Sequence, residues 1–159
     1  MTLIGIDCGK SGGVAWRVNG AAFAEPMPAT EGDLRELLFE IVDSSNVSGV
    51  DLVAWVEEVQ RFCGKNLPAS SIAVLFRNFG FSLGVLSAFN IETRLVRPQE
   101  WQKGLSLGTS KGMTRTEWKN KLKAEAQRRF PKIKVTLKTA DAILLLAYGE
   151  QQPETKKRK

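Results

Sequence analysis

The sequence contains no histidine and only two cysteines, Cys8 and Cys63. Without histidine, no imidazole is available to act as a general base. A zinc site is not expected, because zinc is usually held by histidines and paired cysteines and the chain has no CxxC pair. Two cysteines also do not indicate the disulfide framework of a secreted protein. Carboxylates, lysines and bound metal ions remain as the available chemistry.

The N-terminus lacks the basic segment of a signal peptide and meets an acidic residue at once, in MTLIGIDCG. By inspection, no stretch is long and apolar enough to cross a bilayer. We therefore expect no membrane partner. The expected location is cytoplasmic, in a bacterium or a phage-infected host cell, or else inside an organelle.

Positive charge is concentrated in the C-terminal part of the chain. The net charge is +6, but residues 1–90 carry 6 Lys/Arg and 10 Asp/Glu, whereas residues 91–159 carry 17 Lys/Arg and 7 Asp/Glu. This asymmetry favours a polyanionic partner, first of all nucleic acid. A basic surface that only keeps the protein soluble is the alternative.

Hydrophobic periodicity and turn signals predict an α/β domain. Asn19-Gly20, between two short apolar runs, predicts a hairpin, and Thr30 predicts the N-cap of a helix. The predicted strands are Thr2–Asp7, Gly13–Val18, Ala21–Pro26, Leu52–Val59 and Ile91–Val96, the last of them central. The predicted helices are 31–43, Ser70–Asn90, Arg115–Phe130 and Thr139–Gly149, with loops at Gln60–Ala69 and Gly104–Thr114.

This order is that of the RNase H-like fold: a mixed five-stranded sheet with helices on both faces. Residues 1–150 are expected to form one domain, and residues 151–159 a charged, disordered tail. The segment Ser70–Asn90 is apolar on nearly every side, which predicts a buried helix, and its excess apolar surface suggests a dimer interface.

Three acidic residues, far apart in the sequence, are predicted to converge. Asp7 and Glu57 end two neighbouring strands, and Asp141 lies in the first turn of the last helix. Converging carboxylates repel one another, and hard cations such as Mg²⁺ or Mn²⁺ relieve that repulsion. Two such ions, roughly 4 Å apart, can support phosphodiester hydrolysis. The alternatives are that Asp7 merely ends a strand, that Glu58 replaces Glu57, and that Asp141 offsets a helix dipole.

Four motifs resemble those of the RuvC-like Holliday junction resolvases, especially the phage, poxvirus and chloroplast branch. They are GIDCGKSGGVAW, VEEVQRFCGKN, RPQEWQKGL and KTADAILLLAYG, and the resemblance runs from Thr2 to Gly149. It implies metal ligands at Asp7, Glu57 and Asp141, which would hold two Mg²⁺ or Mn²⁺ ions per site. It also implies an active-site lysine at Lys119, with Lys121 as the neighbouring alternative. A lysine that only touches phosphate or solvent is the other interpretation of Lys119.

The resemblance departs from the bacterial members at Lys138, where they have a fourth acid. It also places the loop tip that enters the junction at Gly64, Lys65 and Asn66. Phe62 there is suited to stacking on a base, and the alternative is that Phe62 only anchors the loop to the core. The residues expected to contact DNA are Phe62, Gly64, Lys65, Asn66, Lys111, Arg115, Lys121 and Lys138.

The implied function is resolution of four-way or branched DNA by a homodimer joined through helix 70–90, with paired metal-dependent cuts. Two alternatives remain at this point. One is a protein that binds junction DNA without cutting it, which Lys138 favours, and the other is a related nuclease acting on RNA–DNA hybrids.

Overall fold

The computed structural model describes residues 2–45, 52–59 and 68–153. The strands are β1 (Thr2–Asp7), β2 (Gly13–Val18), β3 (Ala21–Pro26), β4 (Leu52–Glu57) and β5 (Glu92–Val96). The helices are α1 (Glu31–Ser44), α2 (Ala69–Ala88), α3 (Pro98–Gly104), α4 (Arg115–Arg129) and α5 (Ala140–Glu150). The predicted junction-contacting residues Phe62, Gly64, Lys65 and Asn66 lie outside the described residues, as do residues 154–159 of the predicted tail.

The five strands form one mixed sheet in the order β3-β2-β1-β4-β5. The first three pair antiparallel, whereas β1 pairs parallel with β4 and β4 parallel with β5. Asn19 and Gly20 join β2 to β3 with positive φ angles of 50° and 80°, which confirms the predicted hairpin turn. The prediction that the last strand is central was wrong, because β5 lies at the edge and leaves Leu95 46% exposed.

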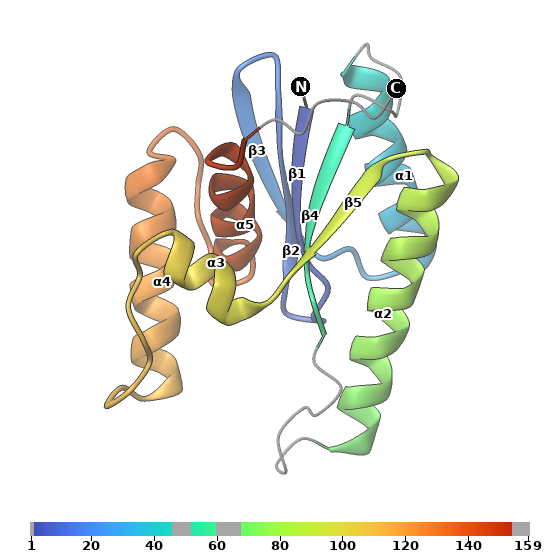
Figure 1. The fold of residues 1–159 in the computed structure, drawn as a ribbon. Helices are drawn as coiled ribbons and strands as arrows, with labels where there is room; N and C mark the ends of the chain where they lie inside the picture. The colour runs from blue at the N-terminus through green and yellow to red at the C-terminus, as the bar shows by residue number, and fades with distance from the viewer. Residues whose placement is uncertain (1, 46–51, 60–67, 154–159) are drawn as a thin grey trace.

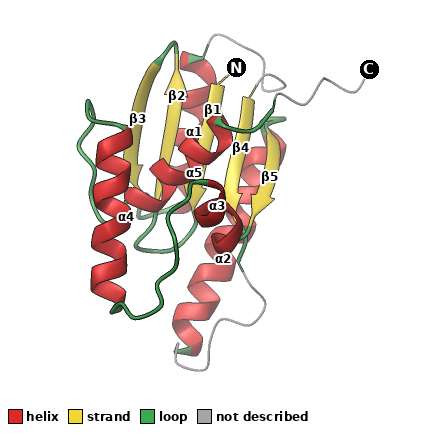
Figure 2. Cartoon of the chain, turned by 60° about the vertical axis from the view of Figure 1, so that its left-hand side comes forward, coloured by secondary structure: helices red, strands yellow, loops and turns green. Residues whose placement is uncertain are grey.

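Helices cover both faces of the sheet, as predicted (Figure 1). Alternate strand residues face opposite sides, so Ile4 and Ile6 pack with α1 and α2, whereas Leu3 and Trp55 pack with α4 and α5. Figure 2 shows α5 and α3 in front of the sheet, with α4 beside α5. Thr30 caps α1 by accepting a hydrogen bond from the backbone N–H of Asp33, as the sequence predicted.

Helix α3 was missed by the sequence analysis, which took Pro98 only as the end of a strand. Pro98 instead occupies the first turn of a helix, where its fixed φ is favourable and its missing N–H costs nothing. Trp101 is the fully buried residue of this short helix.

Helix α2 is far more exposed than predicted. Only Ser82, Val85 and Leu86 are buried, and the N-terminal half, with Val74 and Phe76 exposed, extends past the sheet (Figure 1). The helix has 20 residues and an apolar stretch with a mean hydropathy of 1.4, and only 17% of that stretch is buried. By length and composition alone this helix is long and apolar enough to cross a bilayer, so the expectation that no stretch is was wrong. Arg77 and Asn78 interrupt the apolar run, but its mean hydropathy stays high.

Candidate active site

Asp7 and Glu57 lie side by side at the same end of the sheet. Parallel pairing aligns Ile6 with Val56, so the next residue on each strand is one of the two acids. The backbone N–H of Gly9 donates to Asp7 Oδ1 at 3.1 Å. A Cβ at Gly12 would lie 2.6 Å from Asp7 Cγ, so glycine at this position makes room for the carboxylate. The turn after β1 is therefore built around Asp7.

Asp141 reaches the same place because α5 lies very close to β1. A Cβ at Gly5 would lie 2.3 Å from the carbonyl oxygen of Ala142, so only glycine permits this approach. The first turn of α5 then stands over the end of β1, and Asp141 is 5% exposed. Within the described part of the chain, Asp141 Oδ1 is buried without a hydrogen-bond partner.

The structure distinguishes Glu57 from its neighbour Glu58. Trp101 Nε1 donates to Glu57 Oε2 at 2.9 Å, which holds this carboxylate toward Asp7. Glu58 is paired instead with Arg97, at 3.3 Å between Nε and Oε2. Successive strand residues point to opposite faces, so only Glu57 joins the acidic group. Trp101 is thus a site residue that sequence reasoning missed along with its helix.

The acids are held in surroundings that oppose their charge. Burial, and then the charge of Asp141, raise the pKa of Asp7, although the Gly9 N–H and Lys119 act in the other direction. Burial and the charge of Asp7 raise the pKa of Glu57 to about 8. Burial also raises the pKa of the neighbouring Cys8 thiol to about 12, so a thiolate nucleophile is not expected there. The three carboxylates form an acidic cluster whose charges need compensation.

Lys119 supplies one compensating charge. Its Nζ forms an ion pair with Asp141 Oδ2. Burial opposes the ammonium charge, but Asp141, Asp7 and Glu57 raise the pKa of Lys119 overall. Lys121, the alternative from the sequence, lies 5.3 Å from the centre of the Trp118 ring and does not line the cleft. The geometry therefore places Lys119, and not Lys121, among the acids.

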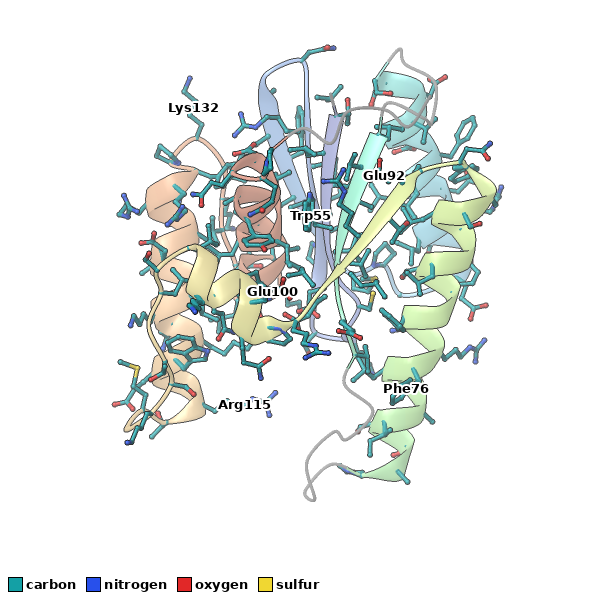
Figure 3. All side chains as sticks on the ribbon, viewed as in Figure 1. Trp55, Phe76, Glu92, Glu100, Arg115 and Lys132 are labelled. Atoms are coloured by element: carbon teal, nitrogen blue, oxygen red, sulfur yellow. The ribbon has the colours of Figure 1, made fainter. Side chains whose placement is uncertain are left out.

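A cleft of about 870 Å³ opens over the acidic cluster, between the N-terminal ends of α2 and α4. Figure 3 shows Arg115 and Phe76 on these two helices, which project past the same end of the sheet. Arg115 and Lys138, two of the predicted DNA-contacting residues, line the cleft together with Lys10. The exposed Lys111 does not line it.

The donor set fits a hard divalent cation in its chemistry. All three acids offer oxygen, one buried oxygen of Asp141 has no described partner, and burial and mutual repulsion disfavour the charges of Asp7 and Glu57. Among residues 2–45, 52–59 and 68–153, no three acidic, histidine or cysteine side chains already form a cage. The Lys119 ammonium engages Asp141 Oδ2, an oxygen that a bound cation would use.

The sheet order, the helices on both faces and the acids at the strand ends define an RNase H-like fold. No family model and no curated protein matches the sequence. Among solved structures, the chain resembles Thermus thermophilus RuvC in complex with a Holliday junction substrate, at 12% identity and a TM-score of 0.64, over 93% of this chain and 91% of that one. A second T. thermophilus RuvC structure gives 16% identity and a TM-score of 0.58, over 93% and 92%. The predicted RuvC-like fold is confirmed.

Replacing Glu57 by Gln should stabilise the metal-free protein. The pKa of Glu57 is raised to about 8, so the folded protein holds a proton on Glu57 that the unfolded chain releases above the ordinary value of 4.5. The stability that goes with this proton is complete below pH 4.5 and is lost as the pH rises toward 8. The Gln side chain keeps an acceptor for Trp101 Nε1 but cannot ionise. In EDTA, we expect the free energy of unfolding at pH 8 to rise by at least about 2 kcal/mol, with little difference near pH 4. Urea unfolding at both pH values measures this.

Glu58→Gln is the matched control, because Glu58 lies next in the chain, is more exposed and pairs with Arg97. We expect its effect to stay within about 0.5 kcal/mol at either pH. If the free energy of unfolding of Glu57→Gln equals that of the wild type at both pH 4 and pH 8, burial and repulsion do not oppose the charge of Glu57.

Proposed function

We propose that this protein is a structure-selective DNA endonuclease that resolves four-way junctions by paired, divalent-metal-dependent cuts in DNA recombination. The observation that carries the proposal is the position of Asp7, Glu57 and Asp141, with Lys119 among them, at the base of a cleft lined by basic residues. Support also comes from the fold, which is that of RuvC from T. thermophilus, a protein solved with a Holliday junction substrate.

In this proposal, Asp7, Glu57 and Asp141 would hold Mg²⁺ or Mn²⁺, two ions per site, and the bound metal would supply activation of water and compensation for the charge of the leaving oxygen. Trp101 holds Glu57 in place through its indole N–H. Lys119 donates hydrogen bonds from Nζ to an oxygen of the phosphate being cut. Arg115 and Lys138 hold the neighbouring phosphates at the cleft walls. The products are a 5′-phosphate and a 3′-hydroxyl.

The test is a cleavage assay on a synthetic four-way junction with Mg²⁺ or with EDTA, with every strand end-labelled in turn. We expect paired cuts at symmetric positions with Mg²⁺ and none with EDTA. A linear duplex and an RNA–DNA hybrid serve as competing substrates. Cleavage of the hybrid as fast as the junction would contradict the proposed selectivity for junctions, and faster cleavage of the hybrid would favour a nuclease acting on RNA–DNA hybrids.

A protein that binds junctions without cutting them is the second candidate. Lys138 favours it, because this exposed lysine lines the cleft where the bacterial resolvases are expected to carry a fourth acid. Tight junction binding with no nicking in Mg²⁺ or Mn²⁺ would establish this alternative and contradict the endonuclease proposal.

We also propose that the protein is a homodimer joined through α2. Phe76 and Phe79 of this helix line an open hollow of about 1030 Å³ together with Leu95 of the edge strand β5. Phe76 is 38% exposed and Leu95 is 46% exposed, so one chain leaves this apolar surface uncovered. A twofold dimer would cover it and would present two cleft openings to a symmetric junction.

Phe76→Glu should convert the dimer to a monomer, because two carboxylates would have to be buried at the contact. We expect sedimentation velocity to give the monomer mass for this variant and the dimer mass for the wild type. Phe39→Glu, at a 50% exposed position on α1 away from this hollow, is expected to stay dimeric. A wild type that sediments as a monomer at all concentrations up to the solubility limit would contradict the dimer.

A further inference from the structure

A second hollow of about 750 Å³ lies beside the cleft, between the segment that joins β3 to α1 and the side of α2 opposite Phe76. Lys10, Val74 and Lys138 line both this hollow and the cleft, so the two are adjacent. We name the second hollow the flanking groove. Arg77 and Glu31 line the flanking groove but not the cleft, which places them farther from the acidic cluster.

The flanking groove carries a net positive charge. Its lining includes three cations, Lys10, Arg77 and Lys138, and one acid, Glu31. Arg77 Nε lies 2.8 Å from Glu31 Oε1, and the two side chains are 73% and 42% exposed. An ion pair this exposed contributes little and opens readily. The guanidinium is therefore available to a stronger anionic partner, and it is well shaped to hold a phosphate through two hydrogen bonds.

The rest of the lining suits the sugars and bases of a nucleic-acid strand. Met27, Pro28 and Phe81, which are partly exposed, supply apolar surface in the same lining. A single small anion would use one charged end of such a hollow and leave the other cations unused. A chain of phosphates uses cations spread along the groove, while its sugars and bases cover apolar surface.

We propose that the DNA strand leaving the acidic cluster runs along the flanking groove, past Lys10 and Lys138, to Arg77. At that point Arg77 exchanges Glu31 for a backbone phosphate. The inference rests on the proposed function, since it takes the bound strand to be the one that is cut. Glu31 then acts as a competitor of DNA, holding Arg77 until a strand occupies the groove.

Arg77→Met and Glu31→Gln should change junction affinity in opposite directions. The measurement is fluorescence anisotropy of a labelled four-way junction with the full chain in EDTA, over a series of salt concentrations. For Arg77→Met we expect binding roughly 3- to 10-fold weaker and a salt dependence smaller by about one unit of slope, as for one lost phosphate contact. For Glu31→Gln we expect binding a few-fold tighter, because Arg77 no longer has a competing partner.

The control is Arg35→Met, which removes an exposed arginine of α1 that pairs with Glu36 and does not line the flanking groove. It should leave affinity and salt slope near wild type. Hydroxyl-radical footprinting should show protection beyond the cut site on the cleaved strand, lost in Arg77→Met and kept in Arg35→Met. Wild-type affinity, slope and footprint in Arg77→Met would overturn the proposal.

The two proposals fail in different ways. If the wild type cuts no junction under any metal condition, the proposed function fails, whatever the binding data show. If the wild type cuts junctions but Arg77→Met and Glu31→Gln both bind like wild type, only the path along the flanking groove fails. A merely structural role for the ion pair predicts that both variants weaken binding together with thermal stability, which would also overturn it.

Discussion

Asp7→Asn should abolish paired nicking of a four-way junction, by at least about 10³-fold, while junction binding is kept. Asn preserves the acceptor for the Gly9 N–H and the shape of the turn after β1, so the fold is not expected to change. It removes a negative charge from the acidic cluster and one oxygen that a divalent cation prefers. Binding depends on the basic residues around the cleft, such as Arg115 and Lys138, which the substitution leaves in place.

Single-turnover cleavage at saturating Mg²⁺ and anisotropy on the same junction separate the two effects. Glu57→Gln and Asp141→Asn should behave like Asp7→Asn, whereas Glu58→Gln should cut at nearly the wild-type rate because Glu58 pairs with Arg97 outside the cluster. Full nicking activity in Asp7→Asn would remove Asp7 from the metal-binding role. Loss of activity in Glu58→Gln alone would show that the wrong glutamate was chosen.

The convergence of the acids was predictable because it depends on strand ends and helix starts. Apolar runs end sharply at Asp7 and Glu57, and a parallel arrangement of these strands puts the two residues at one edge. Asp141 follows from the apolar pattern of α5 and from its order in the fold. The close approach at Gly5 that brings α5 over β1 shows only in three dimensions.

What the sequence did not predict depends on packing between elements. Pro98 is equally compatible with the end of a strand and the first turn of a helix, so α3 and the contact of Trp101 with Glu57 were missed. The strand β5 was predicted to be central, but the neighbours of a strand are decided by the whole sheet, and β5 lies at its edge. The exposure of half of α2 was missed for the same reason, because composition indicates apolar surface but not what covers it.

The sequence also could not decide between Lys119 and Lys121, because α4 is polar on most of its surface and its sequence does not show which side meets α5. The structure pairs Lys119 with Asp141 and lays Lys121 over Trp118. We therefore expect Lys119→Met to lower the single-turnover cleavage rate by about 10²- to 10³-fold, as for loss of a donor aimed at developing charge. Junction affinity should fall by no more than about 3- to 10-fold, the loss expected for one phosphate contact.

The same substitution should tighten divalent-metal binding. Lys119 and a cation compete for Asp141 Oδ2, and an ion pair with a side chain 35% exposed contributes on the order of 1 kcal/mol, so Kd for Mn²⁺ should fall about fivefold by calorimetry. Lys121→Met is the matched control on the same helix and should leave both the cleavage rate and the metal Kd near wild type. A Lys119→Met protein that loses affinity for DNA but keeps its cleavage rate would reduce Lys119 to a phosphate contact, and a loss confined to Lys121→Met would move the role to that residue.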